Sequence, residues 1–113
     1  GIAAVLNEIV SNLKYGIRIY EEKIPTTKDV VSFCEILGFD VVNLASEGRV
    51  IMVVDGSESE KILSAMRRHP LGKMANIIGY VTCEFPKRVV MKTRLGGERF
   101  IEMPAGLQLP RIC

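Results

Sequence analysis

Three side chains in this sequence have types and positions suited to chemistry: Cys113, Glu47 and His69. Cys113 is the last residue, and it ends a segment from Pro104 with two prolines and neither helical nor strand periodicity. Fully extended, such an arm reaches about 33–36 Å, which exceeds the radius of a domain of this size. The sulfur of Cys113 can therefore visit a site outside its own domain. The alternative is a frayed terminus that happens to end in cysteine.

The surroundings of Cys113 favour a carrier sulfur over a self-activated nucleophile. The terminal carboxylate disfavours the thiolate form, whereas Arg111 favours it, so the two neighbours largely cancel. Prenylation is excluded, because a prenylated cysteine needs three further residues after it.

Glu47 lies in the turn 45–48, directly before a run that we expect to be a strand. A carboxylate just before the start of a strand can act as a general base if a substrate group reaches it. The alternative is that Glu47 is a solvated turn residue. His69 is the single histidine, and it precedes Pro70 at the end of a predicted helix. It is either a catalytic group or a cap that suits the helix dipole. Cys34 and Cys83 fall on predicted core faces and receive no chemical role.

The periodicity predicts elements that can position these side chains. Helical spacing covers 2–13, 26–37 and 57–68, and Ser57 with Glu60 forms a capping box for the last helix. Strand patterns cover 17–20, 49–54, 75–84, 88–94 and 98–103. We expect 49–54 to be a central strand buried on both faces, and the last three strands to form a meander. The fold class is therefore α+β, with a mixed or antiparallel sheet of about four to five strands and helices packed on one face.

Length and composition indicate one domain, which we place at 1–103, followed by a flexible arm at 104–113. The 113 residues are 48% hydrophobic and 25% charged, a globular balance, and the net charge of +2 excludes a nucleic-acid footprint. No apolar run approaches the ~20 residues that span a membrane. Three cysteines without a CxxC pair argue against a disulfide framework and a zinc site, so we expect the cytoplasm. Because the chain begins with Gly1, we expect a fragment of a longer polypeptide.

Several short segments together resemble one family, the C-terminal domain of the HypE carbamoyl dehydratases. This family belongs to the aminoimidazole-ribonucleotide-synthetase-like (AIR-synthase-like) superfamily, and the resemblance covers essentially the whole chain. The ending Pro110-Arg111-Ile112-Cys113 is its most specific element. The other matching segments are Leu6-Asn7-Glu8-Ile9, Cys34-Glu35-Ile36-Leu37-Gly38, Ala45-Ser46-Glu47-Gly48, Met66-Arg67-Arg68-His69-Pro70-Leu71-Gly72 and Ile78-Gly79.

The resemblance implies a definite reaction in hydrogenase maturation. Cys113 would receive a carbamoyl group from carbamoyl phosphate through the carbamoyltransferase HypF. ATP would then phosphorylate the amide oxygen, and loss of phosphate would leave a thiocyanate whose cyanide passes to iron on a HypC–HypD complex. Glu47 matches the position proposed to remove the amide proton, although Ser46 stands where the motif often has Asn.

The same resemblance implies a division of labour between two domains. In the family, ATP and Mg2+ bind an N-terminal domain, which also supplies most of the homodimer interface and is absent from this chain. No G-x-x-x-x-G-K-[ST] or G-x-G-x-x-G motif occurs here, so we expect no cofactor or metal site in this fragment and no activity of the fragment alone.

Two alternatives to the dehydratase interpretation remain open. The domain could be a docking module for the transferase or the iron-scaffold complex, with catalysis elsewhere. It could instead be the C-terminal half of another AIR-synthase-like, ATP-dependent synthetase. The terminal cysteine argues against the last alternative, since those reactions need no terminal thiol.

Overall fold

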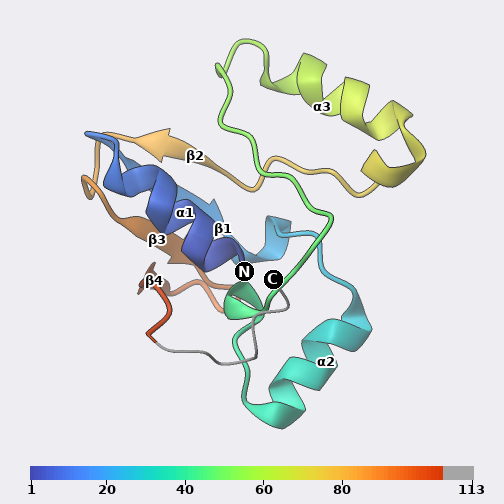
Figure 1. Ribbon diagram of the computed structural model, residues 1–113, viewed down its shortest axis with the longest axis vertical. Helices are drawn as coiled ribbons and strands as arrows, with labels where there is room; N and C mark the ends of the chain where they lie inside the picture. The colour runs from blue at the N-terminus through green and yellow to red at the C-terminus, as the bar shows by residue number, and fades with distance from the viewer. Residues whose placement is uncertain (106–113) are drawn as a thin grey trace.

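The computed structural model describes residues 1–105, and a four-stranded mixed sheet forms its centre (Figure 1). The strands are β1 (Gly16–Tyr20), β2 (Gly79–Thr82), β3 (Val89–Lys92) and β4 (Glu98–Ile101). Their order in the sheet is β2-β1-β3-β4. β1 runs antiparallel to β2 and parallel to β3, and β3 and β4 form an antiparallel hairpin. The predicted α+β fold with a mixed sheet is confirmed.

The predicted meander of the last three strands is wrong, because β1 lies between β2 and β3. The connection from β2 to β3 passes over the start of β1, where Lys87 N–H donates to the carbonyl of Tyr15 at 2.9 Å. Phe85 and Lys87 adopt positive φ angles of 52° and 60°, which turn the chain tightly. Gly16 permits this close passage, since a Cβ there would collide with the carbonyl oxygen of Glu84. The sequence around Pro86 predicts the turn but not the strand that it crosses.

One helix, α1 (Ile2–Ser11), covers one face of the sheet and forms the core with it (Figure 1). Alternation in β1 turns Ile17 and Ile19 toward this helix and Arg18 toward the opposite face. The buried cluster consists of Ala3, Leu6, Val10, Ile17, Ile19, Val42, Val89, Met91 and Ile101.

The other two helices, α2 (Lys28–Leu37) and α3 (Ser59–Arg68), extend away from the sheet (Figure 1). Both helices occur where the periodicity predicts them, and α2 ends at Gly38 with φ of 68°. Each buries one side chain fully or nearly so, Cys34 on α2 and Leu63 on α3. Three single turns of 3-10 helix complete the structure: η1 (Glu21–Lys23), η2 (Val41–Asn43) and η3 (Pro70–Gly72). No helix in residues 1–105 is long and apolar enough to cross a membrane.

Two local predictions around these elements are wrong. The capping box does not form, because the backbone N–H and the hydroxyl of Ser57 both donate to Asp55 Oδ1. These two bonds, the hydroxyl first, hold the pKa of Asp55 below its usual value. Cys83 is exposed and not in the core, since β2 ends one residue earlier at Thr82.

The predicted central strand at 49–54 is also wrong within the described chain. This segment has no regular secondary structure and lies outside the sheet, and its side chains at Val50, Met52 and Val53 are 72%, 49% and 53% exposed. Only Ile51 packs against the core cluster. The apolar composition of 49–54 predicts a buried strand, but no strand within residues 1–105 pairs with this segment.

Candidate functional site

Cys113, the predicted carrier, lies outside the described residues, so its role stays a prediction. The structure does describe the residues that lead to the predicted arm 104–113, from the end of β4 at Ile101, and we call them the root of the arm. Residues 102–105 continue without regular secondary structure.

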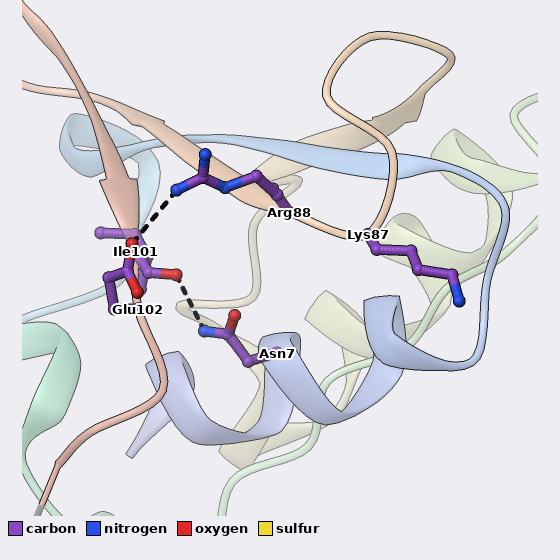
Figure 2. Close-up of a pocket in the computed structure, with 5 residues that line it drawn as sticks. All are labelled: Asn7, Lys87, Arg88, Ile101 and Glu102. Carbon is purple, nitrogen blue, oxygen red and sulfur yellow. Dashed lines mark hydrogen bonds and ion pairs between the residues drawn. The ribbon is translucent and has the colours of Figure 1, made fainter.

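A small pocket of about 150 Å³ marks the root of the arm (Figure 2). Asn7 Nδ2, on α1, donates to the carbonyl of Ile101 at 3.0 Å and to that of Ala3 at 2.8 Å. Arg88 Nη2 forms an ion pair with Glu102 Oε1 at 3.1 Å. The lining residues are Asn7, Lys87, Arg88, Ile101 and Glu102. The end of β4 is therefore held from two sides, by α1 and by the start of β3.

Asn7→Ala should destabilise the protein by about 1 kcal/mol, because the Ile101 carbonyl loses its side-chain donor. Asn12→Ala is the matched control, since the side-chain amide of Asn12 donates to the carbonyl of Glu8 on α1 and does not reach β4. Urea unfolding of both variants measures the effect. Equal stability of the two variants would show that the bond to β4 contributes nothing.

Glu47, the predicted base, lies on an exposed loop that begins at η2. Asp40 Oδ1 accepts the N–H of Val42 at 3.2 Å and thereby caps η2. Val42 is 2% exposed and belongs to the core, which anchors the start of the loop. Directly after Glu47, Gly48 takes the left-handed conformation with φ of 67°, so the chain turns there. The carboxylate thus extends from a short loop with a fixed beginning.

An ion pair links this loop to the strand that carries the arm. Arg99 Nη2, on β4, contacts Asp40 Oδ2, while Asp40 Oδ1 caps η2. The same strand ends at Ile101, where Asn7 holds its carbonyl. β4 therefore contacts both the turn that precedes Glu47 and the helix that fixes the root of the arm. No local pattern in the sequence predicts these contacts of Asn7, Asp40 and Arg99. The one signal is that Asn7 is a polar residue within an apolar helix.

His69, the third candidate, ends α3 and caps the next turn. Its Nδ1 accepts the backbone N–H of Leu71 at 3.2 Å, as a cap of η3. Figure 1 shows α3 well apart from η2, the turn that precedes Glu47, so the structure does not bring these two candidates together. Within residues 1–105, no group of three His, Cys, Asp or Glu side chains could hold a metal ion.

The described fold places one helix on a face of a four-stranded mixed sheet. Residues 1–92 match the C-terminal domain of AIR synthase related proteins, and the chain belongs to this family. Its relatives within the family are hydrogenase maturation proteins of the HypE type, which confirms the resemblance seen in the sequence.

Two relatives are 45% identical to this chain over all 113 residues. One is a putative hydrogenase expression/formation protein from Methanocaldococcus jannaschii, of which the chain covers 33%. The other is a carbamoyl dehydratase HypE from Rhizobium leguminosarum bv. viciae, of which it covers 32%. The chain therefore spans about a third of the length of these relatives.

Solved structures of HypE share this fold. One crystal structure of the hydrogenase maturation protein HypE superposes with a TM-score of 0.91 at 36% identity, covering 100% of this chain and 37% of that one. A second, of HypE in complex with ATP, has a TM-score of 0.90 at 35% identity and covers 100% and 35%. A third, of a HypE–HypF complex, has a TM-score of 0.85 at 43% identity and covers 92% and 33%.

Proposed function

We propose that these residues are the C-terminal part of a carbamoyl dehydratase that acts in [NiFe]-hydrogenase maturation. In this proposal Cys113 carries a carbamoyl group, which the full-length protein converts to a thiocyanate. The observation that carries the proposal is the 45% identity to a carbamoyl dehydratase HypE over all 113 residues, a match that includes the terminal arm. The contacts at the root of the arm support it, because they fix one end of a segment long enough to reach other sites.

The chemistry begins with transfer of a carbamoyl group to the sulfur. The Cys113 thiol loses its proton as the new S–C bond forms, and the bond between the carbamoyl carbon and the leaving group of the donor breaks. The product is an S-carboxamide. We propose HypF as the donor of this group, since a HypE–HypF complex is among the similar structures. The free end of a chain suits this step, because the acceptor sulfur must enter the active site of another protein.

Dehydration then removes one oxygen and two protons from the amide. The γ-phosphoryl group of ATP goes to the amide oxygen, and the nitrogen gives up one proton. The C–O bond breaks as phosphate leaves, and the nitrogen gives up its second proton to form the C≡N bond of the thiocyanate. Glu47 is the proposed base for a nitrogen proton, a role that suits a carboxylate on an exposed loop of fixed origin.

ATP and Mg2+ are assigned to the N-terminal domain of the full-length protein. A similar structure contains HypE with ATP, and this chain covers 35% of it, so most of that protein lies outside these residues. The fragment alone should therefore not hydrolyse ATP. We further propose that the full-length protein is a cytoplasmic homodimer that delivers cyanide to iron on a HypC–HypD complex.

Mass spectrometry of the C-terminal peptide tests the proposal. Full-length protein is incubated with the transferase and carbamoyl phosphate, and ATP is then added. We expect Cys113 to gain one carbamoyl group and then to lose one water. A peptide that stays unmodified, or a carboxamide that persists with ATP, would contradict the proposal.

A further inference from the structure

We propose that Asp40 and Arg99 are positioning residues for the dehydration step, because their ion pair joins the loop that carries Glu47 to the strand that leads to the arm. The inference rests on the proposed function, in which Glu47 is the base and Cys113 carries the amide. The loop at issue is 43–50, and we call it the Glu47 loop.

Both ends of the Glu47 loop are anchored in the core of the domain. Val42, directly before the loop, belongs to the buried cluster, and Ile51, directly after it, packs against that cluster. The start of α1 also contacts the loop, since a Cβ on Gly1 would collide with the carbonyl oxygen of Leu44. Because the loop is short, the positions of its two ends restrict where Glu47 can lie.

Asp40 uses both of its carboxylate oxygens at the start of this loop. Oδ1 accepts the N–H of Val42 at 3.2 Å, and Oδ2 accepts a hydrogen bond from Arg99 Nη2. A carboxylate with a partner on each oxygen is fixed in orientation as well as in place. A shift of β4 at Arg99 would therefore move η2, the turn from which the Glu47 loop begins.

The strand that carries Arg99 also carries the root of the arm. Arg99 and Ile101 are two residues apart on β4, so their side chains point to the same face of the sheet, the one that α1 covers. The carbonyl of Ile101 accepts the side-chain amide of Asn7 at 3.0 Å. One short strand thus contacts both the turn before Glu47 and the helix that holds the root of the arm. The ion pair is the direct side-chain link between these two parts of the candidate site.

This ion pair is better suited to positioning than to stabilising the fold. The side chains of Asp40 and Arg99 are 31% and 43% exposed, and ion pairs that water reaches contribute little to the free energy of folding. Catalytic rates are more sensitive, because a displacement of about 1 Å can slow a reaction about 10²-fold. Breaking the pair should therefore reduce the rate of dehydration without a comparable loss of stability.

A double-mutant cycle in the full-length protein tests the inference. Arg99→Gln removes the charge but leaves a polar side chain, and we expect it to slow single-turnover dehydration about tenfold. The rate of carbamoylation and the Tm should stay at their wild-type values. In the Glu47→Gln background, Arg99→Gln should slow dehydration no further, because Arg99 acts through Glu47.

Lys61→Gln is the matched control for loss of an exposed ion pair. Lys61 Nζ lies 3.5 Å from Glu58 Oε2 at the start of α3, and neither residue belongs to the candidate site. We expect Lys61→Gln to leave both rates and the Tm unchanged. Equal slowing of dehydration by Lys61→Gln and Arg99→Gln would overturn the inference.

The remaining outcomes separate this inference from the proposed function. Wild-type dehydration in Arg99→Gln would overturn the inference alone, and so would an effect of the same size in both backgrounds, since Arg99 would then act independently of Glu47. A lower Tm with equal slowing of both steps would also overturn it, because the ion pair would then have only a structural role. Wild-type dehydration in Glu47→Gln would instead contradict the proposed base itself.

Discussion

Cys113→Ser in the full-length protein should abolish carbamoyl transfer, while Cys83→Ser should leave it unchanged. A serine hydroxyl is nearly isosteric with the thiol but is a far weaker nucleophile near neutral pH, because its proton is much harder to remove. Cys83 is the matched control, since it is an exposed thiol that lies in the loop after β2. The measurement is incorporation of labelled carbamoyl from carbamoyl phosphate in the presence of the transferase.

The control variant distinguishes a specific carrier from general thiol reactivity. Incorporation that persists in Cys113→Ser and is lost in Cys83→Ser would move the carrier role to the domain surface. Loss in both variants would indicate that the folded state, and not one sulfur, had been changed.

Glu47→Gln should accept the carbamoyl group at the wild-type rate but dehydrate it about 10²–10⁴-fold more slowly, the usual contribution of a positioned base. The amide of glutamine keeps the size of the side chain and cannot take a proton from the carbamoyl nitrogen. Glu35→Gln is the control, because Glu35 is an exposed glutamate on α2. Single-turnover loss of the carboxamide after ATP addition measures the dehydration step alone.

The two steps separate a chemical role of Glu47 from a structural one. Equal slowing of carbamoylation and dehydration would show that the substitution disturbs the loop or the arm. A normal dehydration rate would leave Glu47 as a solvated turn residue.

Local signals in the sequence predict most of the elements but not how they assemble. The apolar spacing predicts all three helices, and Gly38 and the Gly96-Gly97 turn occur where a left-handed residue or a hairpin is needed. The position of β1 between β2 and β3 follows from a contact of Gly16 with a loop almost 70 residues later in the chain, which no local pattern encodes. Residues 49–54 have a high strand propensity, but propensity alone does not determine whether a segment joins a sheet.

The candidate site shows the same limit. Residue type and position predict Glu47 in its turn and Cys113 as the last residue, and both stay predictions. Two described contacts lie at the segments that lead to these residues. Asn7 meets Ile101 across 94 residues of sequence, and Asp40 meets Arg99 across 59. Such pairs leave no spacing signal, because their partners are far apart in the sequence.

The fate of the amide oxygen tests the central claim most directly, since the claim is that ATP dehydrates a carboxamide held on Cys113. Full-length protein is loaded from carbamoyl phosphate that carries a heavy isotope in its carbonyl oxygen, and ATP is then added. We predict that the isotope appears in inorganic phosphate, in step with the loss of one water from the C-terminal peptide. Isotope that remains on the peptide, or that is released without entering phosphate, would contradict the account.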